Sequence, residues 1–325
     1  MPGEFDVIKR YFTRPSRRRD VLLSVGDDCA LLQVPADQAL AVSTDTLHAG
    51  VHFPFDTNPY DVGWKSLAVN LSDLAAMGAQ PAWATLAISL PSEEPDWLQR
   101  FSDGFFALAE QHQLALVGGD TTRGPLSITV TVHGFVPFAQ ALRRDRAQVG
   151  DIVAVTGTVG DAGRALQHAL HEQAISDAAD AGTLLARLNR PTPRVDVGLA
   201  LRSLCHAAID ISDGFAQDFQ HVLTASGVSA ELQLEQLPLS AALLRQTPDP
   251  LSALRFALQS GDDYELCLTC PPANWLAAQA AAAACGVPLT AIGHIVSGRS
   301  PLQLSLHGQP FVLTGRGYDH FGVPT

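Results

Sequence analysis

The chain has 325 residues, of which 46% are hydrophobic and 17% are charged, a balance typical of a globular protein of about two domains. Its net charge of −12 argues against a general nucleic-acid binder, and its apolar segments are too short to predict a membrane span. Five scattered cysteines, an odd number, favour reduced thiols and a cytoplasmic setting, and the mixed, charged N-terminus is not typical of a signal peptide.

The first half of the chain predicts strands that lead into aspartates. Ala39–Ser43 is apolar and predicts a buried strand that ends at Thr44-Asp45. Leu114–Val117 predicts another strand, which stops at Gly118-Gly119-Asp120. Leu126–Val136 alternates apolar residues with threonines, the period of a half-buried strand. We therefore expect two of the aspartates at strand ends.

A helix is predicted between these strands. Asp61–Met77 carries one apolar stripe, and Gly78 suits the position after its last turn. Asn70 and Asp73 lie off the stripe and three residues apart, so we expect them to face a common neighbour.

A domain boundary is predicted near residues 148–150, which gives two domains, residues 1–149 and 150–325. Beyond the boundary, the order of strand, aspartate turn and helix recurs faintly. Ala207–Ile211 predicts a strand, after which Ser212 or Asp213 can cap the helix Phe215–Ala225.

Acidic residues recur beside the predicted strands of both halves, at Asp28, Asp45, Asp73, Asp120, Asp210, Asp213 and Asp262. Taken singly, each is more typical of a turn or a helix cap than of a metal ligand. If they converge, their like charges raise one another's pKa values, and divalent cations, which prefer oxygen ligands, relieve the repulsion. Gly118 and Gly119 let backbone N–H groups approach an anion, and Thr44 offers a hydroxyl oxygen. The set therefore predicts a metal-dependent site for a polyphosphate.

Several common motifs are missing from the chain. It has no G-x-x-x-x-G-K-[ST], no H-R-D or D-F-G and no H-E-x-x-H, which excludes P-loop kinases, protein kinases and zincins. Other features keep two interpretations: Arg14–Arg19 is a solvated loop or a phosphate clamp, and Arg144 belongs to a solvated linker or contacts a phosphate. By itself, His52 is an ordinary loop histidine.

Together the motifs resemble those of the bacterial thiamine-monophosphate kinase family, essentially from end to end. The resemblance lies in Gly26–Leu31, Ser43–Thr46, Asn70–Gly78, Gly118–Gly124, Ile211–Gly214, Asp263–Leu266 and Gly317–Phe321. It implies an α/β (α+β) fold of two domains, like that of aminoimidazole ribonucleotide synthetase, with N-terminal strands forming a barrel across a homodimer. The chain lacks the reactive N-terminal cysteine of selenophosphate synthetases and the C-terminal cysteine tail of a related maturation enzyme, which favours the thiamine branch.

The resemblance also implies roles for individual residues. The implied metal ligands are Asp28, Thr44, Asp45, Asp73, Asp120, Asp210 and Asp213, with Asp45, Asp120 and Asp213 central to catalysis. The implied nucleotide contacts are Gly119, Asp120, Arg144 and Ser212. The implied contacts to the thiamine part are His52, Asp262 and Tyr318; the family often has glutamate where this chain has Asp262.

The implied reaction is ATP-dependent phosphorylation of thiamine monophosphate, assisted by several Mg²⁺ ions. The N-terminal domain would bind ATP and Mg²⁺ and form the dimer, and the C-terminal domain would complete the substrate site. A sibling ATP-dependent synthetase and a non-catalytic sensor of nucleotides or thiamine phosphates remain the alternatives.

Overall fold

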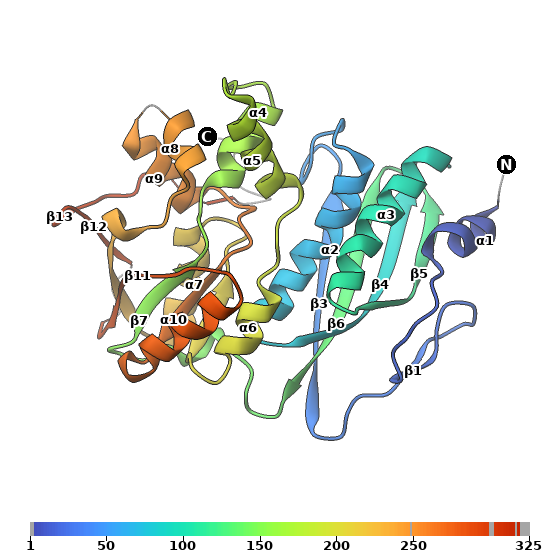
Figure 1. Ribbon diagram of the computed structural model, residues 1–325, viewed down its shortest axis with the longest axis horizontal. Coiled ribbons are helices and arrows are strands. Elements are labelled where there is room, and N and C mark those ends of the chain that lie inside the picture. The colour runs from blue at the N-terminus through green and yellow to red at the C-terminus, as the bar shows by residue number, and fades with distance from the viewer. Residues whose placement is uncertain (1–2, 248, 299–301, 316, 319–325) are drawn as a thin grey trace. The chain divides into compact units, whose positions relative to one another are not determined.

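The computed structural model describes residues 3–247, 249–298, 302–315 and 317–318. Its contacts divide the chain into two compact units, one of residues 1–74 and 79–139 and one of residues 75–78 and 140–325. Each unit combines a sheet with helices (Figure 1). None of the helices in the described part of the chain has both the length and the apolar character needed to cross a bilayer.

The first unit is built on a four-stranded sheet in the order β3-β6-β4-β5. Its strands are β3 (Gln38–His48), β4 (Gln80–Leu90), β5 (Ala115–Arg123) and β6 (Ser127–Pro137). β4 and β5 run parallel, and the other neighbours run antiparallel. The remaining elements are α1 (Glu4–Val7), η1 (Ile8–Phe12), the paired strands β1 (Val21–Leu23) and β2 (Leu31–Leu32), α2 (Pro59–Ala76) and α3 (Pro95–Gln111).

Helices α2 and α3 lie side by side over one face of this sheet (Figure 1). Glycines allow the close approach, because a Cβ on Gly63 would lie 2.0 Å from the carbonyl oxygen of Phe101, and one on Gly104 would lie 1.9 Å from that of Tyr60. The faces of β6 differ accordingly: Ile128, Val130 and Val132 are fully buried, whereas the residues between them are half-buried. The sheet thus has a helix-covered face and an open face. 

The second unit is built on a seven-stranded sheet in the order β13-β12-β9-β11-β7-β10-β8. Its strands are β7 (Ile152–Thr156), β8 (Ala207–Asp210), β9 (Ser229–Gln233), β10 (Leu266–Cys270), β11 (Leu289–Val296), β12 (Gln303–Leu306) and β13 (Gln309–Pro310). All neighbours are antiparallel except β12 and β9.

Helices surround this second sheet. They are η2 (Arg144–Arg146), α4 (Asp161–Ala169), α5 (Ala178–Asn189), α6 (Val195–Leu201), α7 (Phe215–Ser226), η3 (Leu234–Gln236), α8 (Ala241–Gln246), α9 (Pro250–Gln259), η4 (Pro272–Asn274) and α10 (Trp275–Ala284). The main core joins strand residues such as Val153 and Ile209 to Phe215 and Phe219 of α7 and Leu258 of α9. A smaller core lies among α4, α5 and α8.

Two local predictions are corrected. The strands do not end at the aspartates, since β3 runs three residues past Asp45 and β5 runs three residues past Asp120. Hydrogen bonds to β6 and β4 carry both strands through these polar stretches, which sequence periodicity alone does not predict. The helix after Asp213 begins at Phe215 with Gly214 as its N-cap residue, and neither Ser212 nor Asp213 caps it through a side chain.

Candidate active site

On the open face of the first sheet, hydroxyl groups form two rungs. Thr44 Oγ1 lies 2.8 Å from Thr131 Oγ1, and Thr46 Oγ1 lies 2.8 Å from Thr129 Oγ1. The rung of Thr46 and Thr129 continues across the sheet, because Thr129 is paired with Ala87 of β4 and Ala87 is paired with Asp120 of β5. Directly paired residues share a face, so the exposed carboxylate of Asp120 belongs to this hydroxyl-rich side.

The next row of the sheet belongs to the helix-covered face. Asp45 is paired through buried Val130 and Leu86 with Gly119. Its N–H donates to the side-chain oxygen of Asn70 at 3.1 Å, and Asn70 is fully buried on α2. One turn along α2, the carboxylate of Asp73 accepts a short hydrogen bond from the Ser43 hydroxyl.

Asn70 and Asp73 were predicted to face a common neighbour, and the structure shows that this neighbour is β3. The sheet, however, separates two of the central aspartates, because Asp45 points to the helix side and Asp120 to the open side. Within the residues that the structure describes, no group of three or more His, Cys, Asp or Glu side chains lies close enough to hold a metal ion. The predicted ligand set therefore stays a prediction.

The residue of β5 that lies in the same row of paired residues as Asp45 is Gly119, and only glycine fits this position. Its φ is +151°, and a Cβ there would lie 1.8 Å from the carbonyl oxygen of Leu86. Only glycine lets β5 pass so close to β4 while leaving its own backbone exposed beside Asp120.

The other predicted residues of the first unit lie in loops. Asp28 is exposed, and its N–H donates to the Asp27 carboxylate at 2.8 Å. His52 is half-buried; its Nδ1 accepts the N–H of His48 at 3.0 Å, and its carbonyl accepts from the buried Lys65 at 3.3 Å. The imidazole of His52 is therefore oriented by the end of β3.

In the second unit, the turn after β8 is held from within its own helix. One carboxylate oxygen of Asp218, on α7, accepts the N–H groups of Ser212, Asp213 and Gly214 at 3.0, 3.0 and 3.1 Å. Burial raises the pKa of Asp218 to about 7, and the nearby charge of Asp213 adds to the rise, while the three N–H donors oppose it. Asp210, at the end of β8, is buried.

A second loop, Gly261–Glu265, is bonded to that turn. The N–H of Asp262 donates to Ser212 O at 2.9 Å, and the N–H of Tyr264 donates to Ile211 O at 2.8 Å. The Tyr264 hydroxyl donates to the Asp262 carboxylate at 3.0 Å. Asp262 is thereby fixed beside the turn that carries Asp213.

The C-terminal segment reaches the same turn. Tyr318 is 46% exposed, and its N–H donates to Asp213 O at 3.1 Å. Its carbonyl accepts from the side chain of Gln217 on α7 at 2.8 Å. The second unit thus brings together four predicted site residues from three distant segments: Ser212, Asp213, Asp262 and Tyr318. The following Asp319–Phe321 lie outside the described residues.

Arg144 lies in η2 and is exposed. Neighbouring Arg143 forms an ion pair with Asp145 at 2.6 Å, whereas the Arg144 side chain has no hydrogen bond or ion pair among the described residues. Its backbone is fixed, since the Ser226 hydroxyl donates to Arg144 O at 2.8 Å. The guanidinium of Arg144 is therefore available to an anion.

Comparison with known proteins places these features in a family. Residues 26–136 match the family described as AIR synthase related protein, N-terminal domain, and residues 148–302 match the corresponding C-terminal domain. The chain is 50% identical over 323 residues, 99% of each chain, to thiamine-monophosphate kinase of Escherichia coli K12. The chain belongs to the thiamine-monophosphate kinase family.

Solved structures agree with this membership. The crystal structure of thiamine-monophosphate kinase from Stenotrophomonas maltophilia K279a is 51% identical, with a TM-score of 0.84 over 90% of this chain and 93% of that one. AaThiL complexed with AMPPCP and TMP is 31% identical, with a TM-score of 0.78 over 89% of each chain. The predicted family, enzyme class and two-domain α/β fold are confirmed, and the barrel across a dimer stays a prediction.

The roles of four residues of this thiamine-monophosphate kinase family member were not predicted from the sequence. Arg187 and Arg194 both bind the buried carboxylate of Glu265, which the Asp-Tyr-Glu motif contains without a role having been assigned to it. The motif was a usable signal for Glu265, but nothing around the two arginines marks them. The role of Asp218 was missed as well, because a carboxylate on the first turn of a helix is usually only a surface residue.

Proposed function

We propose that the protein transfers the γ-phosphoryl group of ATP to thiamine monophosphate and releases thiamine diphosphate and ADP. The observation that carries the proposal is the 50% identity, over the whole chain, to a thiamine-monophosphate kinase. The related AaThiL bound to AMPPCP and TMP supports ATP as the co-substrate and thiamine monophosphate as the acceptor.

The acceptor in this reaction needs little activation. It is an oxygen of a phosphate monoester, whose second pKa is about 6, so the oxygen is largely deprotonated at neutral pH. Catalysis then rests on holding two polyanions in line and neutralising their charge, rather than on a general base.

We propose that Mg²⁺ ions are held by Asp28, Thr44, Asp45, Asp73, Asp120, Asp210 and Asp213. The donor chemistry fits, because these residues offer carboxylate and hydroxyl oxygens and no soft ligand. When bound, Mg²⁺ supplies the positive charge that two phosphate chains require. Asp45, Asp120 and Asp213 are the proposed catalytic residues among them.

Contacts to the two substrates follow the chemistry of the remaining residues. The exposed backbone at Gly119, the turn at Ser212 and the guanidinium of Arg144 suit the phosphates of ATP. The thiazolium of the acceptor is cationic, so the Asp262 carboxylate and the Tyr318 ring are suitable neighbours. His52 completes the proposed substrate set.

We also propose the arrangement in which the enzyme works. Residues 1–149 would bind ATP and Mg²⁺ and form a homodimer, residues 150–325 would complete the substrate site, and the location would be the cytoplasm. The uncovered part of the first sheet supports the dimer, because Leu40 and Val42 of β3 are 42% and 56% exposed. The five free cysteines support a reducing compartment.

The decisive experiment is an incubation of the purified protein with ATP, Mg²⁺ and thiamine monophosphate, followed by chromatography for thiamine diphosphate. Product formation that stops when EDTA is added is expected. Turnover of formylglycinamidine ribonucleotide in its place would identify a sibling synthetase, and binding of both ligands without product would identify a sensor.

The metal proposal has its own test in Asp120→Asn. We expect kcat to fall by at least about 100-fold, because an uncompensated phosphate charge remains in the transition state. The melting temperature should change little, since Asp120 is exposed. Asp103→Asn, which changes another exposed carboxylate, on α3, is the control and should keep full activity. A fall in melting temperature large enough to explain the loss of kcat by unfolding would contradict a metal role.

A further inference from the structure

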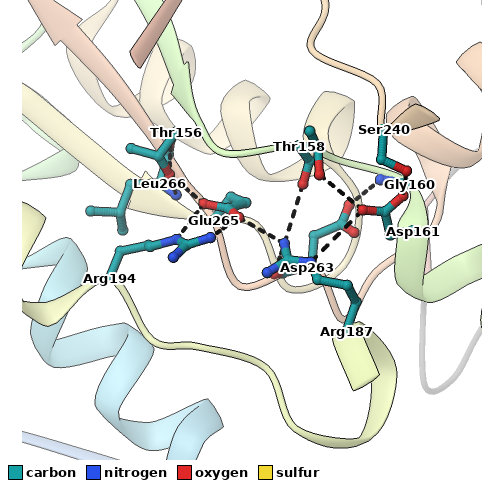
Figure 2. Close-up of polar contacts among 10 residues, drawn as sticks. All are labelled: Thr156, Thr158, Gly160, Asp161, Arg187, Arg194, Ser240, Asp263, Glu265 and Leu266. Atoms are coloured by element: carbon teal, nitrogen blue, oxygen red, sulfur yellow. Dashed lines mark hydrogen bonds and ion pairs between the residues drawn. The ribbon is translucent and has the colours of Figure 1, made fainter. Parts of the chain in front are cut away.

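The second unit buries a carboxylate with two arginines around it. Glu265 has no exposed surface. Arg194 binds it with two nitrogens, Nε to Oε2 at 2.7 Å and Nη2 to Oε1 at 2.5 Å, and Arg187 Nη2 donates to Oε1 at 2.7 Å. Figure 2 shows the carboxylate with both guanidinium groups and the Thr156 hydroxyl around it. A buried charge persists only with such complete pairing, so this is a rigid clamp.

The clamp lies at the end of a loop with an unusual backbone. In Gly261–Glu265, the φ of Asp262 is +67° and that of Tyr264 is +50°, left-handed values that non-glycine residues rarely adopt. Such conformations persist only where the surroundings fix them. The loop therefore depends on the contacts that hold its two ends.

Further contacts tie the same loop to the clamp. Arg187 Nη2 also donates to Asp263 O at 3.4 Å and to Thr158 O at 3.2 Å. The carboxylate of Asp263 is buried and accepts the N–H of Gly160 at 2.7 Å (Figure 2). The space around Glu265 is closed, because a Cβ on Gly157 would lie 2.2 Å from its Oε1. Neither Glu265 nor the loop can shift without breaking these contacts.

We propose that Arg187 and Arg194 are positioning residues for the substrate: by clamping Glu265 they hold the Asp262 side chain in the place where it contacts the thiamine part. The inference rests on the proposed function for the role of Asp262. The chain of contacts runs from the guanidinium groups to Glu265, from the Glu265 backbone to Ile211 at 2.8 Å, and from Asp262 to Ser212 at 2.9 Å. Ser212, a proposed nucleotide contact, is also held by the Asp218 carboxylate at 3.0 Å, so loss of the clamp should disturb the nucleotide side less than the thiamine side.

The test compares Arg187→Met with Arg245→Met. Arg245, on α8, is the control, because its ion pair at 2.5 Å is with Asp180 of α5, the helix that carries Arg187, and not with the loop. In Arg187→Met, KM for thiamine monophosphate should rise at least about tenfold, whereas KM for ATP should stay within about twofold. Arg187→Lys should fall between wild type and Arg187→Met, because an ammonium restores the charge but not the fork of contacts. If Arg187→Met does not fold, the KM ratio of Arg187→Lys decides in its place.

A second readout does not depend on turnover. Amide hydrogen exchange of the peptide that contains Asp262 and Tyr264, measured without ligands, should be faster in Arg187→Met than in wild type and unchanged in Arg245→Met. Equal rises in both KM values, or unchanged exchange in this peptide, would overturn the proposal. A wild-type protein that makes no thiamine diphosphate would overturn the proposed function, while the exchange comparison would still decide whether the clamp holds the loop.

Discussion

At the scale of single residues, Asp218 shows how one buried carboxylate organises a turn. One oxygen of its carboxylate accepts the backbone N–H groups of Ser212, Asp213 and Gly214 and so fixes the backbone of the turn. Burial nevertheless raises its pKa to about 7, well above the 3.8 of a free aspartate. The folded protein therefore holds a proton here that the unfolded chain releases at lower pH.

This difference predicts a pH dependence of stability in the absence of metal. Between pH 4 and pH 7 the native state binds more protons at Asp218 than the unfolded state, so the free energy of unfolding falls as pH rises and levels off above pH 7. The upper bound is about 4 kcal/mol, from about 1.4 kcal/mol per pKa unit. Urea unfolding in EDTA at pH 5 and pH 8 should give a smaller difference for Asp218→Asn than for wild type. An equal difference would contradict the raised pKa.

At the scale of elements, β5 illustrates how a strand carries a functional backbone through a sheet. Gly119 pairs with Leu86 in the parallel ladder, at a φ that no side chain tolerates well. The strand therefore continues to Arg123 and presents Asp120 from its middle, not from its end.

Two glycine substitutions should have opposite effects. Gly119→Ala should lower the free energy of unfolding by more than about 2 kcal/mol, because the new Cβ would meet the Leu86 carbonyl at 1.8 Å. Gly182→Ala should raise it by about 0.5–1 kcal/mol, because Gly182 lies inside α5 with nothing within 4 Å of the added Cβ. Equilibrium urea unfolding measures both, and a tolerated Gly119→Ala would show that β4 and β5 can separate there.

At the scale of the whole molecule, the open face of the first sheet is only partly covered by the described residues. The β1–β2 hairpin packs over one end of it, where Val21 and Leu32 contact the cluster around Trp83. Farther along, β3 pairs only with β6 among the described strands and exposes Leu40 and Val42. An edge strand of 11 residues with apolar side chains is a surface that a second copy can cover.

We expect sedimentation velocity to give a dimer for the wild type and a monomer for Val42→Glu, because a charge in an apolar interface is costly to bury. Leu276→Glu is the control, since Leu276 is 79% exposed on α10 of the second unit, and it should stay dimeric. A monomeric wild type would end the dimer proposal, and a dimeric Val42→Glu would move the interface away from β3.

The sequence by itself determined much of this protein. Periodicity predicted α2 and α7 nearly to their bounds, because local patterns fix local structure. The motif set led to the correct family, because several motifs in one chain are together specific. Ser212, Asp213, Asp262 and Tyr318 come together around one turn, and the roles that the resemblance implies for them stay predictions.

Only the tertiary structure decided which groups meet. The register of β3, β6, β4 and β5 puts Asp45 and Asp120 on opposite faces of the sheet. A one-residue shift in the pairing of one strand would move its side chains to the other face. Arg187 reaches Glu265 across 78 residues of chain. Asp218 binds the turn before α7, where the sequence predicted that Ser212 or Asp213 would cap the helix. Such pairings depend on packing between distant segments, whose geometry no local period of the sequence encodes.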